Sequence, residues 1–181
     1  MAGSARVDSR VRVFRSRTVY RGRVLTLRVD EVAEPGGVRA EREVVVHPGS
    51  VVVLPCLADG GVILVRQFRY AARKCLWELV AGSLNPRETV LAGARRELAE
   101  ETGYRAQRMR RFLTFYPSPG FLTERMHLVE ARGLRPAKAR PEPDERIEVG
   151  RFRRSELESM VTSGTIQDGK TLVALLWLFK S

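Results

Sequence analysis

The stretch that decides the fold and the chemistry of this chain is GSLNPRETVLAGARRELAEETGY, from Gly82 to Tyr104. From Thr89 onward its apolar residues recur at spacings of three and four, which predicts an amphipathic helix. Thr89 is a residue type favoured at helix N-caps, and Gly103 stands where a left-handed C-cap belongs. The apolar positions of this expected helix are Leu91, Ala94 and Leu98.

Three glutamates crowd the second half of that helix. Glu97 and Glu101 are four residues apart and share one face, and Glu100 lies beside them. On an exposed helix such like charges repel by about 0.2–0.5 kcal/mol per pair. A hard divalent cation would reverse this cost because it binds carboxylate oxygens. The residues alone leave a second interpretation open, a solvated acidic face paired with Arg95 and Arg96.

The spacing of the whole stretch resembles the signature of the Nudix hydrolases, enzymes that cut a nucleoside diphosphate linked to another group. The matching pattern is Gly82, five residues, Glu88, seven residues, Arg96-Glu97-Leu98, one residue, Glu100-Glu101, one residue and Gly103. The next position, usually aliphatic in the family, is Tyr104. The resemblance implies Mg²⁺ as cofactor, with Mn²⁺ as an alternative, and these metal ligands: the backbone carbonyl of Ala81 and the carboxylates of Glu97, Glu100 and Glu101.

Arg96 has two interpretations. It lies about 100° around the helix from Glu97, so we expect it to point away from that neighbour. One role is to hold another carboxylate, such as Glu88, in place for catalysis. A purely structural helix arginine explains the same residue equally well.

Other positions resemble the branch of the family that hydrolyses ADP-ribose. Pro119 stands sixteen residues after Gly103, where that branch has a marker proline. The segments Gln67-Phe68-Arg69-Tyr70 and His47-Pro48-Gly49 also match it. Trp77-Glu78-Leu79-Val80-Ala81-Gly82 matches with one departure, since Val80 replaces a common proline. The resemblance covers roughly residues 40 to 180.

The resemblance also implies roles outside the helix. An acidic loop of that branch supplies a catalytic glutamate, and Glu145 is the best match, followed by Glu142 and Glu148. Taken without the resemblance, each substrate-side residue has another interpretation, which is that of an ordinary surface ion-pair residue. The implied substrate-binding residues are Arg69 and, less strongly, Arg42 on phosphate, Glu124 near the ribose, Glu78 as a brace of the pocket, and Gly82 and Pro119 beside them.

Composition bounds the other function classes. The 181 residues, 44% of them hydrophobic, suffice for one ordinary domain with a small appendage. No apolar run approaches the roughly 20 residues of a membrane span, and the first ten residues lack the apolar part of a signal peptide. We therefore expect a cytoplasmic protein without membrane contact.

The net charge of +11 raises the question of a nucleic-acid partner. Only four of the 32 basic residues are Lys, and Arg occurs throughout the chain instead of in one block. We therefore expect a small anionic substrate and no dedicated nucleic-acid face. Cys56 and Cys75 lack any CxxC or Cys/His neighbours, so we expect two buried free thiols.

Alternating patterns before residue 48 predict three short strands, Val11–Val13, Arg23–Val29 and Arg39–Val46. This small antiparallel sheet is too small for a core of its own. The resemblance implies that it crosses to a partner subunit in a homodimer and helps bind the nucleobase. Tyr20 and Phe14 are candidates for stacking on the base, and core positions are the alternative for both.

Further along, a buried strand from Ser50 to about Leu57 precedes Asp59-Gly60, a type I′ hairpin signal. The expected partner strand is Val62 to Arg69. Later strands are expected at Ala106–Tyr116, Arg125–Ala131 and Arg146–Phe152. Residues 133–144 predict a loop, Ser155 with Glu158 a capping box, and Lys170–Lys180 a final helix.

We therefore expect an α+β fold in two parts. Residues 1–48 form the small antiparallel sheet, and residues 49–181 form a Nudix-type α/β/α sandwich with a mixed sheet. The expected function is metal-dependent hydrolysis of ADP-ribose to AMP and ribose 5-phosphate. One alternative is a pyrophosphatase for another nucleotide sugar, such as ADP-glucose or GDP-mannose. The other is a Nudix-fold regulator that binds nucleotide or RNA without turnover.

Overall fold

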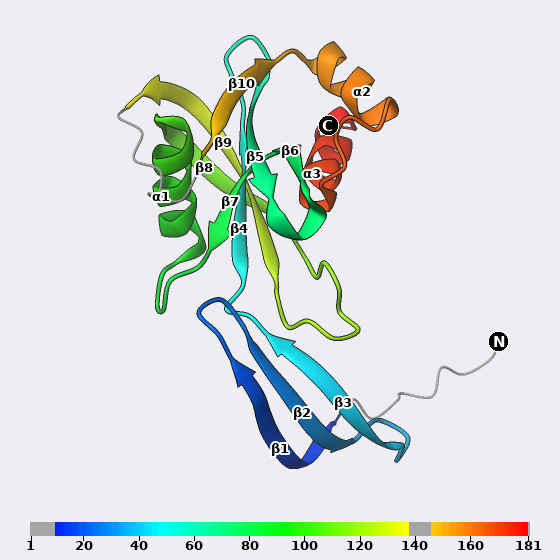
Figure 1. Ribbon diagram of the computed structural model, residues 1–181. Coiled ribbons are helices and arrows are strands. Elements are labelled where there is room, and N and C mark those ends of the chain that lie inside the picture. Colours follow the sequence, from blue (N-terminus) through cyan, green and yellow to red (C-terminus); the bar gives the residue numbers. More distant parts are fainter. Residues whose placement is uncertain (1–9, 138–145, 181) are drawn as a thin grey trace, which may run out of the picture. The chain divides into compact units, whose positions relative to one another are not determined.

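The computed structural model describes residues 10–137 and 146–180, and they form two compact units (Figure 1). The first unit comprises the described residues up to His47 together with Ser118–Glu124. The second comprises Pro48–Pro117 and the described residues from Arg125 onward. We expected residues 1–48 to form a separate sheet, but the sequence did not indicate that a segment from the middle of the chain joins it.

The first unit is a three-stranded antiparallel sheet of order β1-β2-β3. Its strands are β1 (Arg12–Arg21), β2 (Thr26–Ala33) and β3 (Arg39–Val46). Strand β1 is longer than expected, β2 begins and ends later than expected, and β3 has the expected bounds. The chain turns between β2 and β3 at Glu34, whose carbonyl accepts a bond of 3.0 Å from Gly37 N. On the other edge of β3, Val45 N donates to the Phe121 carbonyl at 2.8 Å.

Most side chains of this sheet face outward in the unit. Every residue of β1 is exposed, including Phe14 at 43% and Tyr20 at 59%. Phe14 and Tyr20 are therefore not core residues of this unit. Among the described residues of the unit, no helix covers the sheet. Asp30 is the exception among the charges, since it is buried and accepts bonds from Ser16 Oγ (2.6 Å) and Arg28 Nη2 (2.8 Å).

The second unit places strands between helices. A four-stranded sheet of order β7-β4-β9-β8 is mixed, because β4 and β9 run parallel and the other neighbours antiparallel. A three-stranded antiparallel sheet of order β10-β5-β6 adjoins it. Helix α1 lies on one side of the strands, and α2 and α3 lie on the other (Figure 1). This confirms the expected sandwich, although we had not foreseen the second sheet.

The elements of the second unit have the following bounds: β4 (Ser50–Pro55), β5 (Val62–Arg69), a 3₁₀ turn (Tyr70–Ala72), β6 (Lys74–Glu78), β7 (Val80–Ser83), α1 (Val90–Thr102), β8 (Tyr104–Phe115), β9 (Met126–Pro136), β10 (Glu148–Phe152), α2 (Arg154–Thr162) and α3 (Gly169–Phe179). None of the helices within residues 10–137 and 146–180 is both long and apolar enough to cross a membrane.

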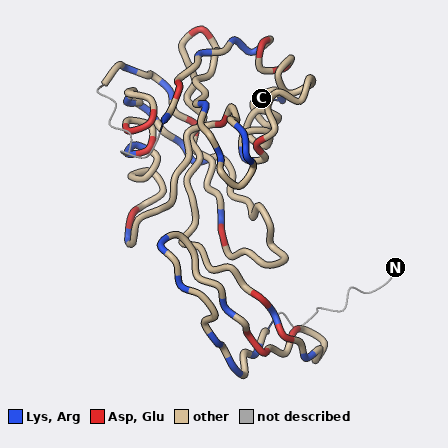
Figure 2. The backbone as a smooth tube through the Cα atoms, in the orientation of Figure 1, with Lys and Arg blue, Asp and Glu red and all other residues tan. Residues whose placement is uncertain are grey.

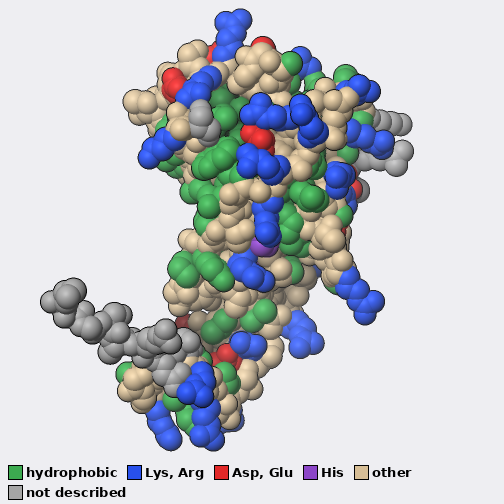
Figure 3. Space-filling view, turned by 180° about the vertical axis from the view of Figure 1, so that it is seen from behind, with side chains coloured by type: hydrophobic (Ala, Val, Ile, Leu, Met, Phe, Trp, Pro, Cys, Tyr) green, Lys and Arg blue, Asp and Glu red, His purple; other side chains and the backbone are tan. Residues whose placement is uncertain are grey.

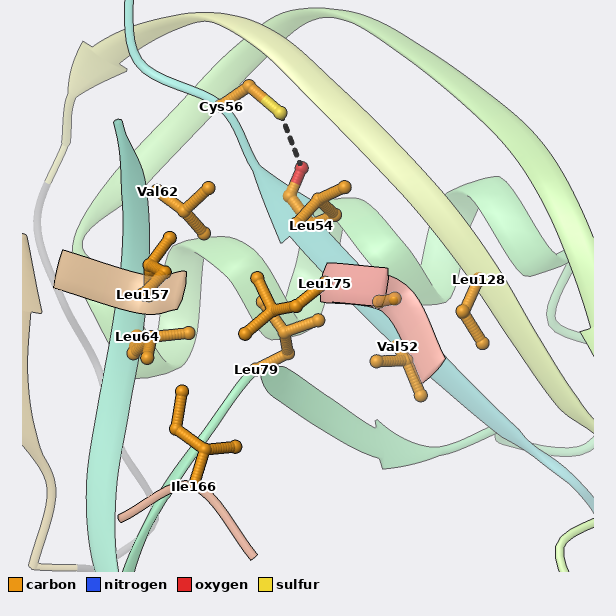
Figure 4. Close-up of a cluster of buried hydrophobic side chains, with 11 residues drawn as sticks. Val52, Leu54, Cys56, Val62, Leu64, Leu79, Leu128, Leu157, Ile166 and Leu175 are labelled. Carbon is orange, nitrogen blue, oxygen red and sulfur yellow. Dashed lines mark hydrogen bonds between the residues drawn. The ribbon is translucent and has the colours of Figure 1, made fainter. Parts of the chain in front are cut away.

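Alternate residues of β4 enter two hydrophobic clusters. Val52 and Leu54 belong to the cluster that includes Leu64, Leu79 and Leu175 (Figure 4). Val51 and Val53 face the other cluster, which contains the α1 residues Ala94 and Leu98. Each such buried aliphatic side chain contributes roughly 1.5–3 kcal/mol to folding. Burial on both sides explains why β4 reads as a continuous apolar run.

The expected hairpin around Asp59-Gly60 is wrong. A type I′ turn needs positive φ at both central residues, and of this pair only Gly60 has it, at 84°. The strands that flank the turn belong to different sheets, and one isolated bridge, Cys56 to Val62, connects them. Asp59-Gly60 does form a turn, but β4 and β5 pair with other strands and not with each other.

Two later expectations also need correction. The loop expected over 133–144 starts later, since β9 continues to Pro136 and pairs with Tyr104. Helix α2 is capped by Arg153 instead of Ser155. Glu156 Oε2 accepts from Arg153 N at 2.6 Å, so the glutamate three residues after the cap is Glu156 and not Glu158.

The two cysteines differ, contrary to the expectation that both are buried. Cys56 is buried, its Sγ lies 3.7 Å from the Leu54 carbonyl (Figure 4), and burial raises its pKa to about 11. Cys75 is exposed because it lies on β6, an edge strand of its sheet. Its apolar neighbours in the sequence belong to the same edge strand, whose outer positions face water.

We expect Cys75 to react with a thiol reagent in the folded protein and Cys56 to be protected. The physical reason is that the thiolate is the reactive form, and the raised pKa and burial of Cys56 suppress it. Titration with Ellman's reagent should count one thiol in the native protein and two after unfolding. Cys75→Ser should remove the native reaction. A native count of two would contradict the structure.

Candidate active site

Helix α1 begins and ends as its local sequence predicts. Thr89 Oγ1 accepts a bond of 3.2 Å from Ala92 N, which caps the N-terminus. Gly103 has a φ of 69°, and its N–H bonds to the Ala99 carbonyl at 3.1 Å. Charged residues follow one another closely along this helix (Figure 2).

The carboxylate of Glu97 lies directly against the backbone of β7. A Cβ atom added to Gly82 would stand 1.8 Å from Glu97 Oε1 and 2.1 Å from its Cδ. A side chain at residue 82 would therefore displace the carboxylate end of Glu97 from its present position. The contact places Glu97 beside the Ala81–Gly82 segment. Glu97 and, one turn later, Glu101 are both buried, at 8% and 4% exposure.

Arg96 links the acidic residues of this site. Its Nε and Nη2 each donate to Glu88 at 2.9 Å, the pairing expected from the sequence. Its Nη1 donates to Glu97 at 2.6 Å and to Glu100 at 3.2 Å. The expectation that Arg96 points away from Glu97 is therefore wrong, because the long side chain lets its guanidinium reach back across one residue. A role for Arg96 in catalysis stays a prediction.

Glu88 ties the loop before α1 to the helix. Its Oε2 accepts from Asn85 N at 3.0 Å while the carboxylate also binds Arg96. A Cβ added to Gly93 would come within 3.2 Å of the same oxygen, so the helix passes close to this loop. The bonds from Arg96 lower the pKa of Glu88 to about 2. The carboxylate is therefore fully ionised at neutral pH.

Arg69 and Glu78 form a second group. Arg69 Nε and Nη2 donate to the two carboxylate oxygens of Glu78 at 2.8 and 2.7 Å. The bonds to Glu78 raise the pKa of Arg69, and the nearby negative charge of Glu101 adds to this effect. The Arg69–Glu78 pair therefore lies near enough to Glu101 of α1 for the charge of Glu101 to act on Arg69.

Sequence reasoning missed three residues at the start of α3 that complete this group. Lys170 Nζ donates to Glu78 at 2.5 Å and also to Asp168, which in turn accepts a bond from Thr171 Oγ1. The sequence did contain one indication of this group, an aspartate and a lysine at the N-terminus of an otherwise apolar helix. Charged residues in such a place need partners of opposite charge. Their partner Glu78 lies about 90 residues away along the chain, so the sequence did not reveal the pairing.

Three expected substrate residues belong to the first unit. Arg42 donates to both oxygens of Glu34, at 2.7 and 3.0 Å, in an exposed ion pair. Glu124 lies 3.6 Å from His47 Nδ1, and Pro119 is part of the same Ser118–Glu124 segment. Figure 3 shows basic side chains over both units, in keeping with their spread along the sequence.

The expected catalytic glutamate lies outside the described residues. Glu145 and its first alternative, Glu142, both fall in the part of the chain that the structure does not describe. The third candidate, Glu148, starts β10 and is 62% exposed, with Arg66 Nη1 at 3.3 Å. This is the environment of a solvent-facing strand residue.

Two protein-family models match different parts of this chain. Residues 46–175 match the model of the NUDIX domain. The chain belongs to the Nudix family. Residues 12–45 match a second model, the nucleoside diphosphate sugar hydrolase N-terminal domain. The Nudix match spans α1, the close contact between Gly82 and Glu97, and the group around Glu78.

Proteins similar in sequence to this Nudix hydrolase differ in the activity for which they are named. An ADP-ribose pyrophosphatase of Bacillus subtilis is 36% identical over 162 residues, 88% of each chain. A methanol dehydrogenase activator of Bacillus methanolicus is 34% identical and covers 92% of this chain and 91% of its own. A GDP-mannose pyrophosphatase of Pectobacterium atrosepticum is 37% identical over 77% of each. A crystal structure of an ADP compounds hydrolase matches the fold with a TM-score of 0.83, at 22% identity, over 98% of this chain and 95% of that one.

Nudix hydrolases generally depend on divalent metal ions, and the donors here suit one. Glu97 and Glu101 supply buried carboxylate oxygens, the donor type that hard divalent cations prefer, and Arg96 Nη1 donates to both Glu97 and Glu100. Within residues 10–137 and 146–180, no three acidic, His or Cys side chains converge closely enough to hold an ion in this arrangement. In this arrangement the carboxylates of Glu97 and Glu100 bind Arg96.

We expect Glu88→Gln to reduce stability most at neutral pH. The folded-state pKa of about 2 lies below the ordinary 4.5, so the ionised carboxylate stabilises the fold above about pH 4.5. This contribution is lost as pH falls toward about 2. Urea unfolding of wild type and variant should show free energies of unfolding that converge on acidification.

Glu158→Gln is the matched control for that comparison, since Glu158 makes an exposed pair with Arg154. Such pairs contribute only about 0–1 kcal/mol. A gap between wild type and Glu88→Gln that stays constant with pH would show that the Arg96 pairing does not stabilise the fold.

Proposed function

We propose that this Nudix hydrolase cleaves the diphosphate bond of ADP-ribose, giving AMP and ribose 5-phosphate, with Mg²⁺ as its metal. Water attacks one phosphorus, and the bridging oxygen leaves with the other phosphate. The observation that carries the proposal is a pair of buried carboxylates on α1, Glu97 beside the glycine of β7 and Glu101 one turn later. Two relatives named ADP-ribose pyrophosphatase, at 36% and 38% identity, support the choice of substrate.

In this proposal the acids of α1 hold the metal. Glu97, Glu100, Glu101 and the carbonyl of Ala81 are its protein ligands. When bound, Mg²⁺ neutralises negative charge on phosphoryl oxygens and binds water. Mn²⁺ is the alternative because it prefers the same oxygen ligands. Arg96 holds the carboxylates in reach of one another and joins them to Glu88, so it acts as a positioning residue.

The substrate is anionic, and Arg69 is the cation best placed for its diphosphate. Two of its nitrogens bind Glu78, while Nη1 makes no hydrogen bond to any described residue. We assign Arg69 to phosphate, Glu78 to bracing it, and Gly82 to the floor beside Glu97. Arg42, Pro119 and Glu124 of the first unit are assigned to the substrate as well. Arg42 must then exchange its ion pair with Glu34 for the ligand.

The proton of the attacking water needs an acceptor. We assign this role to Glu145, an acid between the expected loop and β10. Glu142 and Glu148 are the alternatives, and the exposed pairing of Glu148 with Arg66 makes it the weaker one. A carboxylate that accepts the proton must be within hydrogen-bond reach of that water.

A panel of diphosphate-linked substrates tests the proposed reaction. Purified protein with Mg²⁺ should release AMP and ribose 5-phosphate from ADP-ribose with the highest kcat/KM of the panel. The second candidate is a hexose nucleotide sugar, favoured by the similarity to a GDP-mannose pyrophosphatase. A clearly higher kcat/KM on GDP-mannose or ADP-glucose would replace ADP-ribose. The absence of product from every compound would favour a binding protein.

We expect Glu101→Gln to lower turnover by about 10²-fold or more. Losing a metal-ligand carboxylate should cost at least as much as losing a residue that supports a ligand, for which 10–100-fold is typical. Steady-state assays at saturating Mg²⁺ measure the effect, and Glu158→Gln on exposed α2 is the matched control. Near-normal turnover in Glu101→Gln would remove this residue from the site.

We also propose a cytoplasmic homodimer formed through the N-terminal sheet. Its support is the apolar exposure of β1, where Val13, Phe14, Val19 and Tyr20 are all at least 43% exposed. Light scattering after size exclusion should give about twice the 20.4 kDa of one chain. Val13→Glu should shift the population toward monomer, because burying an unpaired charge is costly. A monomeric wild type would refute the dimer.

A further inference from the structure

A carboxylate at the end of β6 is almost completely removed from water. Glu78 is 1% exposed and accepts hydrogen bonds from two cations. Arg69 binds both of its oxygens, and Lys170 Nζ donates to Oε2 at 2.5 Å. Burial by itself would raise the pKa of Glu78, but the bonds from Arg69 and the charge of Lys170 outweigh burial and lower it. The carboxylate is therefore ionised, and its charge depends on both partners.

The first turn of α3 fixes this carboxylate and the backbone that follows it. Lys170 Nζ also donates to Asp168 at 2.9 Å, and Asp168 caps the helix through Thr171 N at 3.0 Å. Thr171 Oγ1 donates to Asp168 at 2.6 Å and accepts from Leu79 N at 2.8 Å. Leu79 is the residue between Glu78 and β7. The helix thus holds the entry to the strand that carries Ala81 and Gly82.

The charges of this group balance, and their exposure is unequal. Glu78 and Asp168 are negative, and Arg69 and Lys170 are positive. The side chain of Lys170 is 10% exposed, whereas that of Arg69 is 41% exposed. Only the guanidinium is therefore open to a ligand from solvent. If the lysine charge were missing, Arg69 alone would compensate two acids and would attract an added anion less strongly.

We propose that Lys170 is a positioning residue for diphosphate hydrolysis, which neutralises Glu78 and thereby keeps Arg69 available to the phosphates of the substrate. This inference rests on the proposed function, since that function supplies the diphosphate. Lys170 acts only through Glu78 and Arg69. Asp168 and Thr171 support it by orienting the ammonium group and the start of β7.

A purely structural role must be separated from positioning. Removing one partner of a buried ion pair destabilises proteins, whatever the function of the pair. Loss of folded protein lowers kcat, because fewer molecules are active, and leaves KM unchanged. Loss of an interaction that binds substrate and transition state equally raises KM and leaves kcat unchanged. The split between KM and kcat therefore distinguishes the two roles.

The test compares Lys170→Met with Lys74→Met on the substrate of the panel that wild type cleaves best. Lys74 is an exposed lysine of β6 that binds neutral Gln167 at 2.5 Å, so its replacement should leave KM unchanged. Lys170→Met should raise KM by about 10-fold, since interactions with charged groups contribute roughly 1.5–3 kcal/mol. A KM equal to that of wild type overturns the inference. Wild-type inactivity on every substrate instead overturns the proposed function.

A second background keeps the inference falsifiable if Lys170→Met does not fold. In Glu78→Gln the negative charge that Lys170 and Arg69 share is gone, and Asp168 is the remaining acidic partner of Lys170. Adding Lys170→Met to Glu78→Gln should then change KM by less than about twofold, the usual limit for independent effects. An increase of about 10-fold in this background would show that Lys170 does not act through Glu78, and would overturn the inference.

Discussion

The active site depends on the close approach of one carboxylate to one strand. Glu97 occupies the space where a side chain of residue 82 would stand, at 1.8 Å from the position of an added Cβ. The contact shows that the Glu97 carboxylate of α1 lies against β7 at Gly82, the residue after Ala81. Packing of Ala94 and Leu98 against β4 holds α1 against the sheet, so hydrophobic burial maintains the geometry of a polar site.

Bringing acids together in a partly buried place requires nearby cations, and Arg96 and Lys170 are two of them. Arg96 joins Glu88, Glu97 and Glu100 along the helix and its preceding loop. Lys170, from the other side of the strands, joins Glu78 to Asp168. Because an uncompensated buried charge is strongly unfavourable, each cation fixes where its carboxylates can lie. The acids of α1 and the Arg69–Glu78 pair are therefore positioned by ion pairs as much as by the backbone.

Local signals predicted α1 well and strand pairing badly. Thr89, the apolar spacing and Gly103 all act within one helix, so neighbours in the sequence decide its ends. The bounds of β3 and β5 also followed from nearby turn residues. The turn at Gly60 gave no information about partners, because β4 and β5 pair with other strands and belong to different sheets. The exposure of Cys75 likewise depends on which strand lies at the sheet edge.

The sequence by itself determined the family, the motif helix and the acids that it carries, since fixed spacing on a helix places side chains on one face. The Arg96–Glu88 pair was expected, but the folded structure was needed to show the other charge pairs. Arg96 also binds its neighbour Glu97 on α1, and Lys170 meets Glu78 across about 90 residues of chain. The Lys170–Glu78 pair follows from where the strands and α3 come together in space. The Coulomb energy of such a pair depends on the distance between its two charges in space. The order of residues along the chain does not give that distance.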